Sequence, residues 1–241
     1  MKTNVQQQLS LSFAFVVAII AIFCFFSVPI YVQGRALFAK EYASGYFRLP
    51  AYCAAQLLVQ TTVNVAVVCA YTGILAKLQG WNTDGGGGGG GGLWYFMSVN
   101  VTFMLALVAI NETIGSLNSN LFVALALSAL VSVVFILFAG VICAYGNMPP
   151  YLRWLYWCSP CAYATSALIV ANFEGRPAAP VSAGGEENNP LDALTGDEYL
   201  AVFDSPLQSW QADVPGCLLL VWLVFRIACF FSLRHLQKEK R

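Results

Sequence analysis

The chain has 241 residues, of which 59% are hydrophobic and 10% are charged, and its 12 Lys and Arg residues balance 12 Asp and Glu residues. Soluble domains carry about 25% charged residues. This composition, with a mean hydropathy of +0.67, therefore excludes a water-soluble enzyme and indicates a membrane protein. There is no basic excess to favour nucleic-acid binding. Most of the 8 cysteines lie in or beside apolar runs, where small core residues are expected rather than a disulfide framework.

Five apolar runs are long enough to cross a bilayer as helices, which predicts an all-α, polytopic membrane helix bundle, a single domain over residues 1–241. The runs are residues 9–31, 51–78, 93–110, 121–145 and 214–233. Pro29 is expected to kink or end the first run, and the polar residues 111–120 are expected to form a turn. Residues 146–213 form the predicted outer loop. Within it, 151–171 is expected to be a re-entrant or interfacial hairpin, because Arg153 and Pro160 interrupt it.

Basic residues are distributed unequally between the two sides of this arrangement. With the tail 234–241 in the cytoplasm, seven Lys and Arg residues lie on the cytoplasmic side and four on the other. The positive-inside rule therefore predicts a cytoplasmic C-terminus. Residues 33–50 are then cytoplasmic too, and their helically spaced aromatic residues predict a short amphipathic helix at the membrane surface. An outer N-terminus without a signal peptide indicates the later part of a longer protein.

Three amide side chains form a stripe on the second predicted span. Gln56, Gln60 and Asn64 recur every four residues and so share one helix face. An amide that faces acyl chains stays without a hydrogen-bond partner, so the stripe must face other helices or a cavity. Two interpretations stay open: hydrogen bonding between helices, or the lining of a substrate path.

The sequence offers little for chemistry within the membrane, and no catalytic or metal-binding residue is expected. The only histidine, His235, lies in the tail, so neither zinc nor Ser–His chemistry has an evident base. Cys158 and Cys161 have C-x-x-C spacing without the βαβ context of a redox motif. Glu112 lies at the edge of a span and Arg226 is expected to snorkel toward the tail, which leaves proton coupling with little support. The glycine run 85–92 lacks the Lys and Ser/Thr of a phosphate-binding loop.

Three segments resemble ABC transporter subfamily G. Residues 36–51, ALFAKEYASGYFRLPA, are similar to the loop after the second membrane helix of that family. Residues 148–175, MPPYLRWLYWCSPCAYATSALIVANFEG, resemble the region after its fifth helix. TGDEYL at 195–200, followed by Trp210 and a final span, resembles the closing part of breast-cancer-resistance-like half-transporters.

The resemblance implies the membrane-spanning part of an ATP-driven exporter of lipophilic or amphipathic molecules. The chain would supply helices two to six of a six-helix domain that pairs with a second membrane domain, as a homo- or heterodimer, in a lipid bilayer that is expected to be the plasma membrane. ATP and Mg²⁺ would be bound by a separate nucleotide-binding domain. No cofactor and no ATP hydrolysis are therefore expected of this chain by itself. A secondary carrier or channel, and a truncated, non-transporting membrane fragment, are the alternatives.

The resemblance also implies roles for particular residues. It implies that coupling to the nucleotide-binding domain is the role of Arg35, Lys40, Glu41 and Arg48. It implies that the substrate cavity is lined by Ile19, Ile22, Val133 and Ile136. It also implies a gate formed by Val141 and Ile142, whose apolar side chains would meet those of the second copy on the dimer axis. Both side chains are β-branched and therefore stiff. A plain surface helix, and ordinary packing against lipid or other helices, are the alternatives for these sets.

Overall fold

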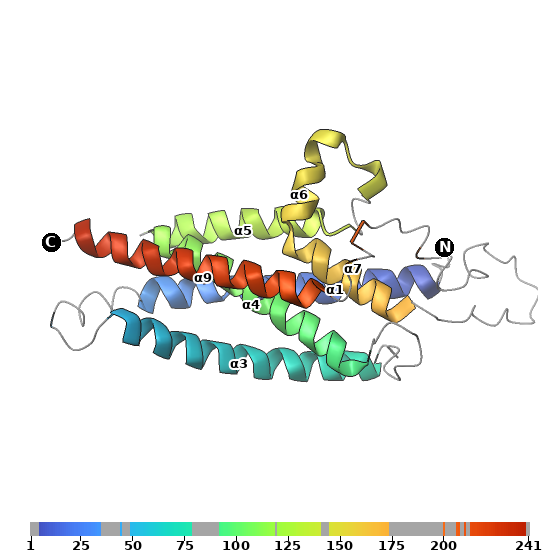
Figure 1. Ribbon diagram of the computed structural model, residues 1–241, viewed down its shortest axis with the longest axis horizontal. Coiled ribbons are helices and arrows are strands. Elements are labelled where there is room, and N and C mark those ends of the chain that lie inside the picture. Colours follow the sequence, from blue (N-terminus) through green and yellow to red (C-terminus); the bar gives the residue numbers. More distant parts are fainter. Residues whose placement is uncertain are drawn as a thin grey trace, which may run out of the picture.

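The computed structural model describes residues 5–34, 44, 49–78, 92–118, 120–140, 145–173, 200, 206–207, 210 and 213–239. The elements of these residues are helices, with no strand among them, which confirms the predicted all-α class. In chain order the elements are α1 (Val5–Phe25), α3 (Leu49–Leu78), α4 (Leu93–Leu117), α5 (Leu121–Leu137), η1 (Tyr145–Asn147), η2 (Pro150–Leu152), α6 (Arg153–Cys158), α7 (Pro160–Phe173) and α9 (Val214–Glu239). The short elements η1, η2, α6 and α7 follow α5 in the chain, and α6 projects from the bundle (Figure 1).

Four helices in the described part of the chain are long and apolar enough to cross a membrane. α5 is apolar but shorter, with 17 residues. It ends at Leu137, before the end of the predicted span 121–145, and residues 141–144 lie outside the described part. The long helices lie along a common axis, with α3 and α5 at opposite edges of the bundle (Figure 1). The four segments long and apolar enough to cross a membrane are Val16–Gly34, Pro50–Leu78, Leu93–Leu117 and Val214–Arg234.

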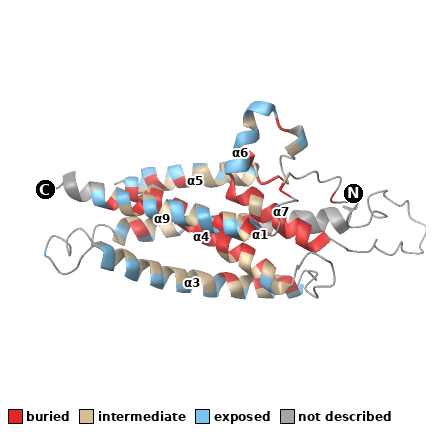
Figure 2. Ribbon diagram, in the orientation of Figure 1, coloured by how far each residue is buried: buried red, intermediate tan, exposed pale blue. Residues whose placement is uncertain are grey.

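α4 is the central helix of the bundle. It contacts α1, α3, α5, α7 and α9. In the most apolar stretch of α4, 67% of the residues are buried, against 6% in α3, and Figure 2 shows this contrast along the two helices. α3 packs mainly against α4 and leaves the rest of its surface exposed. α4 is therefore the core of the fold, and α3 is the helix held by the fewest neighbours.

The predicted turn over residues 111–120 is wrong in its first part. Asn111 to Leu117 continue α4, which ends at Leu117 instead of near residue 110. The polar side chains of this last segment face other helices instead of water: Ser128 of α5 donates a hydrogen bond to Asn111 at 2.7 Å. Asn120 then caps α5, because its side-chain oxygen accepts the N–H of Phe122 at 3.0 Å.

A break near Pro29 divides the first membrane helix. α1 ends at Phe25, Phe26 is a turn residue, and residues 27–34 are helical again. Proline has no N–H to donate to the carbonyl four residues earlier, and its ring crowds that carbonyl, so a helix kinks just before it. The helix is thus interrupted at Phe26, three residues before Pro29, where the sequence predicts a kink or an end. The Phe26 side chain is 60% exposed.

Gly140 lies shortly after the end of α5 and packs against Tyr156 of α6. Its φ is +90°, a conformation that residues with a side chain rarely adopt. A Cβ at this position would lie 3.1 Å from the ring of Tyr156 on α6. The Tyr156 side chain is buried, and its hydroxyl lies 3.1 Å from that of Ser166 on α7, so the ring has little freedom to move. A glycine is required here for two independent reasons.

We expect Gly140→Ala to destabilise the protein by at least about 1–2 kcal/mol, the cost of a left-handed backbone for a residue with a Cβ. Loss of helical circular dichroism during titration of bicelles with a denaturing detergent measures this change. Gly216→Ala is the matched control: this glycine lies in α9, and its added Cβ would meet nothing within 4 Å. The control should be neutral or slightly stabilising. Equal stability of the two variants would contradict the assignment.

Candidate functional site

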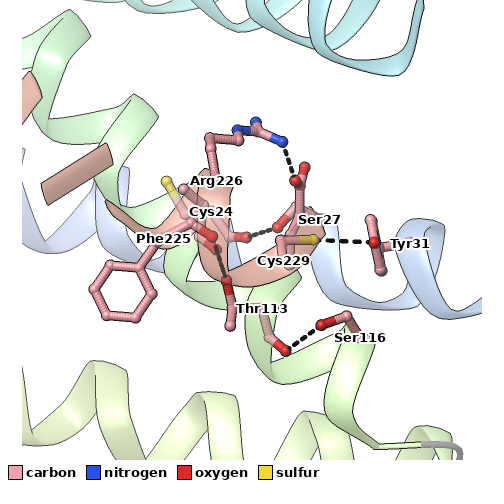
Figure 3. Close-up of polar contacts among 10 residues, drawn as sticks. Cys24, Ser27, Tyr31, Thr113, Ser116, Phe225, Arg226 and Cys229 are labelled. Atoms are coloured by element: carbon pink, nitrogen blue, oxygen red, sulfur yellow. Dashed lines mark hydrogen bonds and ion pairs between the residues drawn. The ribbon is translucent and has the colours of Figure 1, made fainter. Parts of the chain in front are cut away.

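A buried ion pair joins the central helix to the last one. The carboxylate of Glu112 on α4 contacts the guanidinium of Arg226 on α9. The Glu112 side chain is fully buried and that of Arg226 is 14% exposed. In Figure 3 the Arg226 side chain reaches out from its helix toward this contact. The expectation that Arg226 snorkels toward the tail is therefore wrong. An opposite charge 114 residues away in sequence is near enough to neutralise it within the bundle.

Because the pair is buried, each charge needs the other to offset the free energy of its desolvation. A buried charge without a partner is strongly destabilising, because its desolvation is then uncompensated. The pair is also incompletely satisfied: within the described part of the chain, Oε1 of Glu112 and Nε and Nη2 of Arg226 have no hydrogen-bond partner. Gln60 on α3 faces the Glu112 carboxylate. The pair can therefore hold α4 against α9, while its remaining polar atoms can still interact with polar side chains of α3.

Further polar contacts surround the pair and link α9 to its neighbours. Thr113 donates to the carbonyl of Phe225 at 3.1 Å, and the hydroxyls of Ser116 and Ser232 lie 3.0 Å apart. On the other side, the Tyr31 hydroxyl lies 3.1 Å from Cys229 Sγ (Figure 3). In a bilayer such contacts replace hydrogen bonds to water, which is absent. They align the helical residues 27–34, α4 and α9 at one level of the bundle.

Two grooves flank the exposed helix α3. The first, of about 390 Å³, lies between α3 and α9 and reaches the ion pair, since its lining includes Leu57, Glu112 and Arg226. The second, of about 400 Å³, lies between α1 and α3, over a floor from α4. Gln56 lines both, so a single side chain stands on the boundary between them. Their size is that of sites for small organic molecules.

The residues predicted to line a substrate cavity lie on α1 and α5, which contact each other. The side chains of Ile19, Ile22 and Val133 are 50%, 58% and 53% exposed, whereas Ile136 is partly buried against the core. They form part of an exposed apolar face, and none of them lines either groove flanking α3. Their role in substrate binding stays a prediction.

The other predicted functional residues lie outside the described part of the chain. These are the coupling residues Arg35, Lys40, Glu41 and Arg48 and the gate residues Val141 and Ile142. Of the C-x-x-C cysteines, Cys158 is exposed and Cys161 buried, and neither forms a disulfide with a described residue. Among the described residues no cluster of three or more His, Cys, Asp or Glu side chains could hold a metal ion.

Comparison with known proteins identifies the family. Residues 2–173 match the profile of the ABC-2 type transporter family. The chain belongs to this family. It is 26% identical over 223 residues to ABC transporter G family member 12 of Dictyostelium discoideum, which covers 89% of the chain and 33% of that relative. It is 22% identical over 218 residues to ABC transporter G family member 45 of Oryza sativa subsp. japonica, covering 90% of the chain and 15% of the relative.

A third relative of this ABC-2 domain is ABC multidrug transporter H of Aspergillus fumigatus, 25% identical over 188 residues, covering 70% of the chain and 13% of the relative. The chain thus spans a third or less of the length of these three relatives. The predicted resemblance to ABC transporter subfamily G is confirmed, and with it an integral membrane protein with several spans.

We expect Arg226→Leu to destabilise the ABC-2 domain by about 3–5 kcal/mol, because it leaves Glu112 buried without its counter-charge. Changing both residues to leucine should restore most of the loss, since an apolar pair needs no compensation. Detergent-induced unfolding of the two single variants and the double variant forms a double-mutant cycle. A neutral Arg226→Leu variant, or additive losses, would show that the two charges do not interact.

Proposed function

We propose that the chain is the membrane-spanning part of an ATP-driven ABC exporter that moves lipophilic or amphipathic molecules across a membrane. The match of residues 2–173 to the ABC-2 family carries this proposal. Relatives named as ABC transporter G family members and as a multidrug transporter support it. The apolar character of the exposed helix faces and of the grooves beside α3 agrees with apolar cargo.

In the proposed mechanism two membrane domains meet through the exposed face of α1 and α5. The pair encloses a cavity that receives Ile19, Ile22 and Val133 from each copy. Nucleotide-binding domains supply the energy: they bind ATP and Mg²⁺, and residues 33–50, with Lys40 and Glu41, pass their motion to the helices. Export requires that the cargo bind the inward- and outward-facing states with different affinity. Val141 and Ile142 close the outer end of the path, where apolar side chains exclude water.

In this proposal the C-terminus is cytoplasmic and the membrane is the plasma membrane. The orientation rests on the excess of Lys and Arg in residues 33–50 and in the tail. A secondary carrier would instead need ionisable groups that gain and lose charge during transport. The buried acid Glu112 is held by Arg226, which favours a structural role for it over proton transfer.

A chimera tests the export function. The matched region of Dictyostelium ABC transporter G family member 12 is replaced by this chain. Inverted membrane vesicles that contain the chimera are then incubated with a panel of lipophilic dyes. We expect ATP-dependent accumulation of at least one dye, with no accumulation when ATP is replaced by a non-hydrolysable analogue. Accumulation driven by an ion gradient without ATP would instead identify a secondary carrier. A correctly inserted chimera that transports nothing would count against the proposal.

The 241-residue chain alone should not hydrolyse ATP, because its sequence contains no G-x-x-x-x-G-K-[ST] motif to bind the phosphates. Phosphate release from purified protein in nanodiscs measures this. The control is a preparation from cells that carry the empty vector. Turnover above that background, with the same dependence on protein concentration in two independent preparations, would refute this part of the proposal.

The proposed dimer face makes a separate prediction. A benzophenone side chain at position 22, on the exposed face of α1, should crosslink to a second copy of the chain in membranes. The same group at position 58 is the control, because Leu58 is similarly exposed, at 66%, but lies on α3 at the opposite edge of the bundle from α5 (Figure 1). Gel mobility after illumination distinguishes dimer from monomer. Equal dimer yield at both positions would reject this face as the interface.

A further inference from the structure

The groove between α1 and α3 combines an apolar wall with a polar one. Phe23, Phe26 and Ile30 form the first wall, and the amides of Gln56, Gln60 and Asn64 are placed along the second. The three amides are half-buried, so they are neither packed into the core nor fully exposed on the lipid-facing surface. The stripe predicted from sequence therefore faces a cavity.

Two of these amides, those of Gln56 and Asn64, differ from the polar groups that hold the bundle together. Asn100 of α4 donates to Thr72 of α3 at 3.2 Å, and Asn111 accepts from Ser128 of α5 at 2.7 Å. By contrast, no hydrogen bond joins the side-chain amide of Gln56 or Asn64 to any residue that the structure describes. An amide has two N–H donors and an acceptor oxygen, and leaving them unpaired in an apolar region is costly. Hydrogen bonding between described helices does not explain these two residues.

The electrostatics of the groove limits which molecules can fill it. None of its lining residues is charged. Glu112 lies behind Gln60 and is already paired with Arg226. A cation or an anion in the groove would be desolvated without a counter-charge, which is far more costly than burying a neutral polar group. Amides instead both donate to and accept from hydroxyl, carbonyl and amide groups.

We propose that the groove between α1 and α3 binds neutral amphiphiles that carry hydrogen-bonding groups, and that Gln56, Gln60 and Asn64 recognise these groups. The apolar part of the ligand packs on Phe23, Phe26 and Ile30. If the proposed export function holds, this groove selects the cargo. The binding itself does not depend on ATP or on a nucleotide-binding domain.

The dimensions of the groove fit such a ligand. Eight residues separate Gln56 from Asn64, which places their backbones about 12 Å apart along the helix. A rigid or extended molecule with polar groups at its two ends spans that length. The rim residues are strongly exposed, including Ile30 at 73% and Val59 at 68%. A ligand can therefore enter sideways from the bilayer, without passing through water.

Photolabelling of the full chain in nanodiscs of a neutral phosphatidylcholine tests this inference. Four diazirine-bearing alkyl probes are compared that differ only in the head group: primary amide, hydroxyl, trimethylammonium and carboxylate. We expect saturable labelling of residues 23–30 and 56–64 by the amide and hydroxyl probes, and little by the two charged probes. Equal labelling by all four probes, or no saturable labelling of these residues, would overturn the proposal.

Variants locate the recognition on the amides. Gln56→Leu and Asn64→Leu should each raise the concentration of the amide probe needed for half-saturation about fivefold, which corresponds to the loss of one net hydrogen bond. Thr62→Val is the matched control: Thr62 lies on the same helix outside the groove, and its hydroxyl donates to the carbonyl of Leu58 at 2.8 Å. Its labelling should match that of the original chain. Unchanged labelling in both leucine variants would overturn the assignment.

Stability provides a second readout. If the amides face a ligand, the two leucine variants should be as stable as the original chain or more so, because each removes an amide without a partner. If another helix of the assembled transporter occupies the groove, the variants should lose stability or dimer yield, and that result would overturn the proposal. Failure of ATP-dependent transport in the chimera, with neutral-probe binding intact, would reject the export function alone.

Discussion

The Glu112–Arg226 contact constrains how α4 and α9 pack, because it is an ion pair whose carboxylate is fully buried between them. Desolvation makes each of these charges costly, so both helices must stay in register for the pair to persist. The flanking contacts of Thr113 and Ser116 with α9 fix the same register through hydrogen bonds. The core is therefore specified by a few polar contacts within a much larger apolar surface, whose packing alone does not distinguish one register from another.

This constraint is distributed unevenly over the bundle. α4 contacts five other helices, and its polar side chains hydrogen bond to them, as Asn111 does with Ser128 of α5. α3 shares such a bond between Thr72 and Asn100, near the end of the helix remote from the ion pair. Along the rest of its length it carries amides that face a groove. Among the long helices of the described part, the one with the fewest packed neighbours is thus also the one that carries the proposed ligand-binding amides, in keeping with the low local stability expected of binding elements.

Sequence patterns predict the helical class, the positions of the long helices and the kink near Pro29, because each depends on local hydropathy or on a proline. They do not predict the extent of α4: Asn111, Thr113 and Ser116 look like turn residues until their partners on α5 and α9 are known. Local sequence patterns do not predict the Glu112–Arg226 ion pair for the same reason. Glu112 and Arg226 are 114 residues apart, and only the rule that ionisable groups inside a membrane are paired could have joined them.

The position of α3 links the two grooves to each other. Gln56 lines both of them, and Gln60 faces the carboxylate that anchors α4 to α9. A displacement of α3 away from α9 enlarges one groove, narrows the other and removes a polar neighbour from Glu112. A ligand that binds one of these positions more tightly than the other shifts the equilibrium by its difference in affinity. By reciprocity, any force that moves α3 changes the affinity for the ligand by the same free energy. Coupling between the proposed binding groove and the helix core would therefore need no long chain of residues, because α3 lines the groove and also packs on α4.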